Sequence, residues 1–311
     1  MIRSLTSGVS GLRNHQVRMD VIANNIANVN TTAFKAGRVN FQEILSQNIR
    51  GNSMSNIGVD SINPAQIGLG VAVQAIDMLF GQGPPITTDR VLDIMIDGNG
   101  FFRLAKYSDV DIIEYYYTRD GSFYVNNDGY LVNAAGLYVL GVGDPDGEGW
   151  LDDTEITDVT NGTYTVDDTI PGERIRLFDP DSADPDVFPN NLTSLRIDPN
   201  GLVFVNGQME QAALILVDNY TNPENLTRLG GNLYEVPLGG LDDTTPFEEG
   251  WGVPGSEGGQ GKLRSGALEM SNVDLSTEFA NMITTQRGFQ ANARVITVSD
   301  EMLGELINLK R

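Results

Sequence analysis

Carboxylate side chains occupy a characteristic set of positions in one short acidic segment, residues 144–155. Positions 1, 3, 5, 9 and 12 of this segment are Asp or Glu, and position 6 is Gly149, which is the spacing of an EF-hand calcium loop. We therefore predict a calcium site there. Its ligands would be the side chains of Asp144, Asp146, Glu148, Asp152 and Glu155, together with the backbone carbonyl of Trp150.

Two features favour a simpler interpretation of the same segment. Glu148 stands where the strict motif has Asp or Asn, and the flanks 139–143 and 156–160 resemble strand or loop instead of helix. The alternative is a solvated acidic turn, which is common in a chain with 42 acidic and 20 basic residues. If calcium binds, we expect it to order a loop of mutually repelling carboxylates.

The composition of the chain argues against several other kinds of site and binding partner. The chain has no Cys and a single His, His15, so thiol chemistry, Cys/His sites and His-based triads are excluded or nearly so. The net charge of −22 opposes binding to nucleic acid and to anionic membranes. The first residues lack the apolar run of a secretory signal, and no stretch is apolar enough for membrane insertion. We expect no cofactor requirement other than the calcium considered above.

Both ends of the chain carry heptad patterns that predict helices of about 40 and about 50 Å. Asp274 is the expected N-cap of the second helix, and residues 28–32 the expected end of the first. The apolar positions left outside the two seams, such as Ile283, Val295 and Val298, need a further partner. We predict an assembly interface made of Leu5, Val9, Leu12, Met19, Ile22, Ile26, Leu275, Phe279, Met282, Phe289, Ile296, Leu303 and Ile307. The alternative is a two-helix pair that forms no polymer.

Between the helices the pattern changes to short β runs separated by Gly, Asn and Asp, with hairpin signals at residues 97–100, 120–121, 127–129 and 206–207. The predicted fold class is multidomain α+β, with paired terminal coiled-coil-type helices, a central β-rich domain and an acidic insertion. The predicted domains are 1–33 with 270–311 (helical core), 34–66 (linker), 67–142 with 192–262 (β-rich) and 143–191 (acidic insertion or small outer domain).

Four separated segments, in order, resemble the flagellar rod and hook protein family. They are residues 21–35 (VIANNIANVNTTAFK), 97–102 (DGNGFF), 230–234 (GGNLY) and 271–292, which includes SNVDL and QRGFQAN. One departure is Ala33, where relatives commonly have Gly before the Phe-Lys pair. Residues 63–70 and 261–268 look more like the hook branch of the family than the distal-rod branch.

The resemblance implies a structural, non-enzymatic subunit that assembles into the hook, a flexible tubular joint passing torque from rod to filament, or alternatively into the distal rod. The implied partners are further copies of the chain in a helical homopolymer, the neighbouring rod and hook-filament junction proteins, the hook cap and the type III export apparatus. The implied location is the extracellular hook or the basal body, reached without a cleaved signal peptide.

Two other functional classes remain open on the residues alone. A carbohydrate-active enzyme could place two carboxylates together in space, but such sites are lined by clustered aromatics and the chain has only Trp150 and Trp251 with scattered Tyr. A secreted calcium-dependent binding module or adhesin would use the acidic insertion. Neither class accounts for the terminal helices.

Overall fold

The computed structural model describes residues 2–51, 63–108, 111–142, 173–178, 193–206, 212–220, 222–236, 251–255 and 260–309. These residues fall into two compact units. The helical unit comprises residues 1–29, 35–79 and 273–311, and the β unit comprises residues 30–34 and 80–272. The prediction of two terminal helices flanking a β-rich centre is confirmed.

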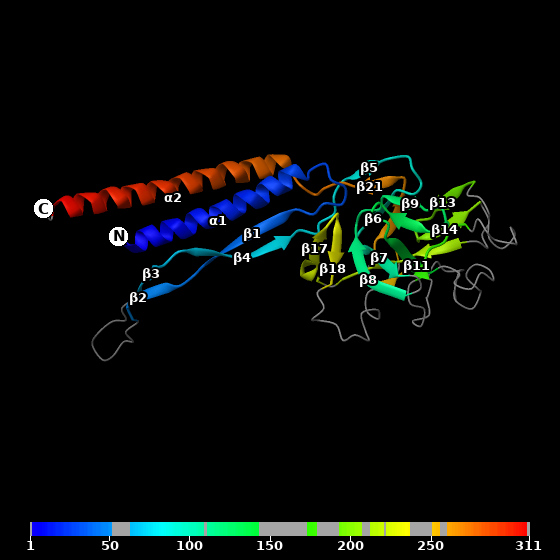
Figure 1. The fold of residues 1–311 in the computed structure, drawn as a ribbon, viewed down its shortest axis with the longest axis horizontal. Helices are drawn as coiled ribbons and strands as arrows, with labels where there is room; N and C mark the ends of the chain where they lie inside the picture. Colours follow the sequence, from blue (N-terminus) through cyan, green and yellow to red (C-terminus); the bar gives the residue numbers. More distant parts are fainter. Residues whose placement is uncertain are drawn as a thin grey trace. The chain divides into compact units, whose positions relative to one another are not determined.

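The helical unit is built on two long antiparallel helices, α1 (Ile2–Ala27) and α2 (Leu275–Leu309), which lie side by side along their length (Figure 1). At 1.5 Å per residue they are about 39 and about 52 Å long. Helix α1 ends at the expected polar stretch, where residues 28–30 form a turn. Because the helices run in opposite directions, the start of α1 and the end of α2 lie at the same end of this unit (Figure 1).

Asp274 caps the N-terminus of α2, as predicted. Its Oδ1 accepts a hydrogen bond from the backbone N–H of Ser276 at 2.9 Å, and its Oδ2 accepts one from the Thr277 hydroxyl at 2.8 Å. These bonds lower the pKa of Asp274, with the Thr277 hydroxyl contributing most and the Ser276 N–H next. The cap satisfies donors that the first turn of a helix leaves free.

Replacing Asp274 by Ala is expected to loosen the first turn of α2. We predict faster amide hydrogen exchange at Ser276 and Thr277, with no change in the middle of the helix, because capping acts only on the first turn. Asp274→Asn keeps an oxygen acceptor and should restore most of the protection. Equal exchange in the Ala and Asn variants would show that the carboxylate is not acting as a cap.

The described parts of residues 34–66 form strands where the sequence predicts a linker. They contain strands β1 (Gly37–Glu43) and β2 (Ser46–Arg50) and the beginning of β3 (Ala65–Gly68), which with β4 (Val71–Met78) belong to the helical unit. Strand β1 pairs antiparallel with β4, and β2 with β3. Polar residues such as Asn40 and Gln42 hide the strand signal in the sequence. The side chain of Asn25 on α1 nevertheless fixes β1, exchanging hydrogen bonds with the backbone N–H and C=O of Gly37.

The β unit contains one extended antiparallel sheet whose main path runs β13-β14-β15-β11-β7-β8-β18-β17, with β9, β10, β12, β16 and β19 attached to it. Two further strand pairs, β6 with β20 and β5 with β21, join early residues of this unit to late ones. The strands are β5 (Pro85–Thr87), β6 (Ile94–Asp97), β7 (Phe101–Ser108), β8 (Asp111–Thr118), β9 (Phe123–Val125), β10 (Leu131–Asn133), β11 (Tyr138–Val142), β12 (Glu173–Arg174), β13 (Leu195–Ile197), β14 (Leu202–Val205), β15 (Ala212–Ile215), β16 (Val217–Asp218), β17 (Thr227–Gly230), β18 (Leu233–Glu235), β19 (Trp251–Gly252), β20 (Lys262–Ser265) and β21 (Ala267–Glu269). A short 3-10 helix, Pro223–Asn225, precedes β17.

Two of the four predicted hairpins are correct and two are wrong. Strands β9 and β10 pair across residues 127–129, and β14 pairs antiparallel with β15, the next strand after Asn206. The signal at 97–100 connects β6 to β7 but does not pair them, because β6 pairs with β20. The signal at 120–121 likewise ends β8 without returning it onto β9, which pairs with β10. A turn signal in the sequence therefore marks a change of direction but does not identify the pairing partner.

The core of the β unit is a continuous apolar cluster drawn from most of its strands. Members with no measurable exposure include Ile94, Phe102, Leu104, Phe123, Val139, Ile175, Leu177, Val205, Ile215 and Val217. One charged pair lies among these strands: Arg103 on β7 and Asp218 on β16 are 2% and 1% exposed, and their Nε–Oδ2 and Nη2–Oδ1 distances are 2.6 and 2.8 Å. Although burial opposes the charge, Asp218 and Tyr117 raise the pKa of Arg103 above its ordinary value.

Ala33, which stands where relatives commonly have Gly, adopts an unusual backbone conformation. Its φ of 54° lies in the left-handed region, and its side chain is 1% exposed. Glycine adopts this conformation without steric cost, whereas an L-residue with a Cβ does so at about 1–2 kcal/mol. The chain thus keeps at Ala33 the backbone conformation that a glycine would favour.

Of the predicted acidic insertion, residues 173–178 are described, and they join the β unit through β12, which pairs with β11. The rest of the segment lies outside the described residues.

Candidate functional site

The two long helices touch through small and polar residues. A Cβ placed on Gly11 of α1 would lie 2.5 Å from Nδ2 of Asn292, and one placed on Gly288 of α2 would lie 2.8 Å from the His15 ring. Gly8 approaches Ile296 in the same way, and the hydroxyls of Ser4 and Ser299 are 3.4 Å apart. We call these residues the glycine seam: Ser4, Gly8, Gly11, His15, Gly288, Asn292, Ile296 and Ser299.

The glycine seam lies one residue away from the heptad that the sequence predicts on α1. The predicted positions Leu5, Val9 and Leu12 flank the close contacts at Ser4, Gly8 and Gly11. Glycine has no side chain, so the backbones of the two helices come close, and this favours the glycine-bearing face as the contact. Leu5, Val9 and Leu12 themselves are half-buried.

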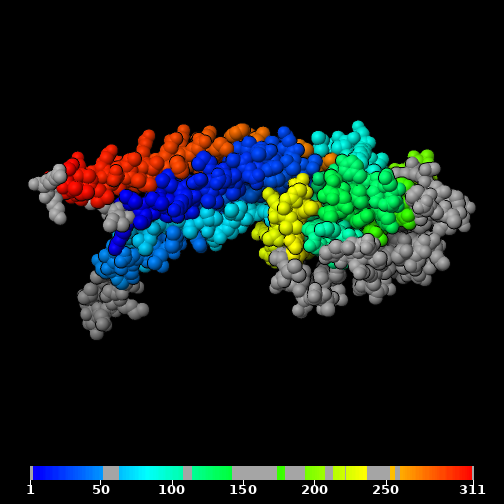
Figure 2. Space-filling view, in the orientation of Figure 1, coloured from blue at the N-terminus to red at the C-terminus, as the bar shows by residue number. Residues whose placement is uncertain are grey.

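Large apolar side chains on α2 remain exposed in two stripes. The proximal stripe is Leu275, Phe279 and Ile283, which are 38, 50 and 51% exposed. The distal stripe is Val295, Val298, Met302 and Leu306, which are 44, 51, 47 and 49% exposed. Their spacing of three or four residues places the members of each stripe along one side of the helix. Figure 2 shows α2 lying along α1 at the margin of the helical unit, with its outer side open in this view.

A groove of about 360 Å³ follows the distal stripe. It is lined by Ser4, Arg294, Val295, Val298, Ser299 and Met302, so it lies where the start of α1 meets the second half of α2. Apolar side chains gain about 1.5–3 kcal/mol each when they leave water. The groove and the distal stripe together form a surface that can accept the apolar side chains of another helix.

The predicted interface residues are not equally available for contact with another molecule. Leu275, Phe279 and Ile307 are exposed, and Ile22 is buried at 4% exposure inside the helical unit. The remaining nine are half-buried: Leu5, Val9, Leu12, Met19, Ile26, Met282, Phe289, Ile296 and Leu303. Whether any of them contacts another copy stays a prediction.

The sequence interpretation missed a second exposed apolar group, which lies in the β2–β3 region of the helical unit. Ile44, Leu45, Ile49 and Ile67 are 45–63% exposed. They were missed because this region was expected to be a linker, although Ile and Leu among Gln and Asn at 41–50 are a strand signal.

His15 packs inside the helical unit without a described hydrogen-bond partner for its Nδ1. The ring lies against Gly288 of α2 and contacts the Phe41 ring of β1 edge-on, with centroids 6.1 Å apart. Burial first, and the Arg18 guanidinium second, hold the pKa of His15 below its ordinary value of 6.5. Glu278 on α2 shifts the other way, because its burial raises its pKa while Asn25 and Arg18 oppose the rise.

Acidification is expected to destabilise the helical unit through His15. Because the pKa of His15 is lower in the folded state, the unfolded chain takes up the proton first as the pH falls, so this contribution is present above about pH 6.5 and is lost below it. Denaturant unfolding followed by helix circular dichroism from pH 8 to 5 should show the wild type losing stability relative to His15→Gln. Glu278 changes the stability with pH in the opposite sense, but it is present in both proteins, so its effect cancels in the difference between wild type and His15→Gln. Parallel curves for the two proteins would contradict the assignment.

The predicted calcium ligands Asp144, Asp146, Glu148, Trp150, Asp152 and Glu155 lie outside the described residues. Within the described part of the chain, no group of three or more His, Asp or Glu side chains is placed to hold a metal ion. The calcium site therefore stays a prediction.

If the prediction is right, calcium titration of the full chain should show binding with a Kd on the order of 10⁻⁴–10⁻³ M, the range of extracellular loops. Terbium is a useful probe, because Trp150 would sensitise its emission. The double substitution Asp144→Asn with Glu155→Gln should abolish the terbium emission. Asp198→Asn, which removes a carboxylate elsewhere in the β unit, should leave it unchanged. Terbium emission that survives the double substitution would indicate a solvated acidic turn.

Among the described residues, no helix is both long and apolar enough to cross a membrane.

Three family models match successive parts of the chain. Residues 5–35 match the model described as flagella basal body rod protein, residues 95–205 match the flagellar hook protein FlgE/F/G D1 domain, and residues 264–309 match the flagellar basal body rod FlgEFG protein C-terminal. The matches include most of α1, all of α2 and much of the β unit.

Curated relatives align over the whole chain. The flagellar basal-body rod protein FlgG of Bacillus subtilis is 37% identical over 314 residues, and that of Borreliella burgdorferi is 31% identical over 315, with 100% of each chain covered. The flagellar hook protein FlgE of Borreliella burgdorferi is 31% identical, again with both chains fully covered, but its alignment extends over 451 residues.

Proposed function

The chain belongs to the flagellar rod and hook protein family, and we propose that it is a distal rod subunit that polymerises through the exposed stripes of α2. The single observation that carries the assembly part is the pairing of α1 with α2 through the glycine seam, in which all seven residues of the two stripes of α2 stay at least 38% exposed. A neighbouring copy would bury them.

The rod is favoured over the hook by the comparisons. The rod relatives align with this chain over 314 and 315 residues, close to its own 311, whereas the hook relative needs 451. The rod relative from Bacillus subtilis is also more similar, at 37% against 31% identity. We therefore propose the distal rod, the alternative, in place of the hook assignment suggested by residues 63–70 and 261–268.

The remaining parts of the proposal follow from family membership. The subunit is a structural component of the flagellar basal body or hook region, and we propose that it acts without catalysis, contacts neighbouring axial proteins, and is delivered by the type III export apparatus without a cleaved signal. A stripe of apolar residues on a long helix supports a role in packing and offers no acid, base or nucleophile for catalysis.

Electron microscopy of negatively stained, concentrated protein tests the assembly proposal. The full chain should form tubes or regular filaments, and the same chain without residues 270–311 should not. Regular polymers from the truncated chain would overturn the assignment of assembly to α2. A full chain that stays monodisperse, even when offered preformed rod ends as nuclei, would overturn the proposed function.

The shape of the polymer tests the choice between rod and hook. A distal rod subunit should give straight polymers, because a drive shaft must resist bending. Curved or coiled polymers would support the hook, since a flexible joint needs subunits that change their spacing as the tube bends. The β unit on its own, residues 80–272, should not polymerise under either reading.

A further inference from the structure

The chain passes between its two units four times, after residues 29, 34, 79 and 272. Within the β unit, the residues next to these four passages form three short segments: 30–34, 80–84 and 269–272. We call them the crossing segments. They are far apart in the sequence, yet within the β unit they are hydrogen-bonded to one another.

Glu269 joins all three crossing segments. Its backbone carbonyl accepts the N–H of Ala33 at 2.8 Å, and its side-chain Oε1 accepts the N–H of Gly83 at 2.7 Å. Glu269 is 2% exposed, so both bonds are made away from water. Buried hydrogen bonds to an ionised carboxylate are among the stronger ones in proteins.

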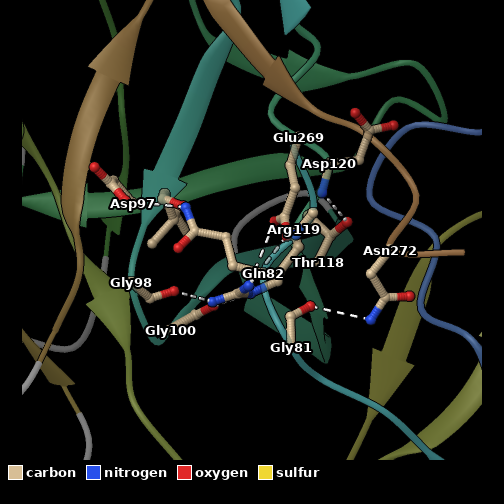
Figure 3. A network of polar contacts seen from close by, with 12 residues as sticks. Gly81, Gln82, Asp97, Gly98, Gly100, Thr118, Arg119, Asp120, Glu269 and Asn272 are labelled. Atoms are coloured by element: carbon tan, nitrogen blue, oxygen red, sulfur yellow. Dashed lines mark hydrogen bonds and ion pairs between the residues drawn. The ribbon is translucent and has the colours of Figure 1, made fainter. Parts of the chain in front are cut away.

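Arg119 holds the Glu269 carboxylate in place (Figure 3). Its Nη1 is 3.4 Å from both carboxylate oxygens, and the guanidinium is 3% exposed. The same guanidinium donates to the backbone carbonyls of Gly98 and Gly100, at 2.8 Å for Gly100. Burial lowers the pKa of Arg119, and Glu269 opposes that shift. The ion pair thus connects the crossing segments to the turn between β6 and β7.

Asn272 and Gly83 make the remaining contacts between the crossing segments. The Asn272 backbone N–H donates to the Phe34 carbonyl at 3.4 Å, and its side-chain amide donates to the Gly81 carbonyl at 3.1 Å (Figure 3). A Cβ on Gly83 would lie 2.0 Å from the Met270 carbonyl oxygen, so only glycine lets these two segments approach so closely. Each crossing segment is therefore bonded to at least one other.

We propose that the Arg119–Glu269 pair is a lock that holds the crossing segments together as one joint and so limits the motion of the helical unit relative to the β unit. A single tether of a few residues would let two units rotate freely, whereas several strands fixed side by side resist bending and twisting. If the proposed function holds, this joint would carry load between the parts of each subunit in the polymer.

A second buried ion pair among the described residues of the β unit provides a matched control. Arg103 and Asp218 are equally buried and also form a carboxylate–guanidinium pair, but their described hydrogen bonds are to each other, within the sheet. Glu269→Gln and Asp218→Asn make the same chemical change, from carboxylate to amide. Both variants should destabilise the β unit, and Glu269→Gln alone should weaken the lock.

Amide hydrogen exchange on the full chain in solution is the first readout. In Glu269→Gln, exchange at Ala33, Gly83 and Met270 should rise about tenfold or more relative to the amides of β14, because the loss of a charge-assisted hydrogen bond opens its neighbourhood locally. In Asp218→Asn, the three amides should change only in step with β14. Exchange that rises uniformly in both variants would overturn the proposal.

Spin labels give a direct readout of motion between the units. The chain has no Cys, so Gln290→Cys on α2 and Asn127→Cys in the β9–β10 turn can be labelled without background. The distribution of label distances should broaden in Glu269→Gln and stay as narrow as wild type in Asp218→Asn. An unchanged width in Glu269→Gln would overturn the lock. Both measurements use the monomer, so they decide this proposal even if the chain forms no tubes.

Discussion

Replacing Val298 by Asp is expected to abolish tube formation while leaving α2 folded. Val298 is 51% exposed, lies in the middle of the distal stripe and lines its groove. The substitution costs the isolated subunit little, because the side chain already meets water. In a polymer the carboxylate would be buried against apolar side chains of a neighbouring copy, and an unpaired buried charge is strongly unfavourable.

The expected size of this effect is an increase of about 100-fold or more in the critical concentration for assembly, equivalent to about 3 kcal/mol per contact. Sedimentation of polymer over a concentration series measures it, and circular dichroism checks that helix content is unchanged.

Thr297→Asp is the matched control for Val298→Asp. Thr297 is exposed on the same turn of α2 and receives the same charge, but it faces about 100° away from Val298. It should assemble at close to the wild-type concentration. If both variants assemble normally, the distal stripe is not an interface; if both fail, added charge anywhere on α2 is the cause and the assignment of the stripe is wrong.

Breaking the buried pair Arg103–Asp218 is expected to give the largest loss of stability in the β unit. Both side chains are at most 2% exposed and are joined by two short hydrogen bonds. Arg103→Gln leaves the Asp218 charge buried with no cationic partner, which typically costs about 3–5 kcal/mol. Denaturant unfolding followed by near-UV signals from the aromatic side chains of the β unit measures the change.

Two comparisons separate this prediction from a general effect of losing an arginine. Arg196 pairs with Asp198 at 2.9 Å but is 77% exposed, so Arg196→Gln should change stability by no more than about 1 kcal/mol. Replacing both members, Arg103→Met with Asp218→Leu, should cost much less than Arg103→Gln, because no unpaired charge remains. A small loss in Arg103→Gln itself would contradict the prediction.

The sequence by itself identified the two terminal helices and the β-rich centre. Local signals were sufficient for these: long apolar periodicity for the helices, Asp274 for the start of α2, and short β runs between Gly and Asp residues for the centre. The family motifs are equally local, and they led to the same family as the comparisons.

The close approach of the two helices at glycines could not be predicted from hydrophobic periodicity. The heptad predicts Leu5, Val9 and Leu12 as the seam, and it does not indicate the close approach of α2 at Gly8 and Gly11, one residue earlier. Packing decides this, because two helices gain more from close backbone approach through glycines when their larger apolar residues can be used elsewhere. A periodic pattern states which residues share a face but not which neighbour that face meets.

Tertiary structure alone decided the pairing of distant strands and the convergence of the crossing segments. Strand β6 pairs with β20, and Glu269 bonds to Ala33 and Gly83, partners separated by more than 150 residues. Hydrogen-bond partners in a sheet are fixed by the fold as a whole, since each backbone N–H is equally able to pair with any strand edge. The sequence therefore determined what the elements of this protein are, and long-range packing determined which of them are joined and which surfaces are left for a second copy.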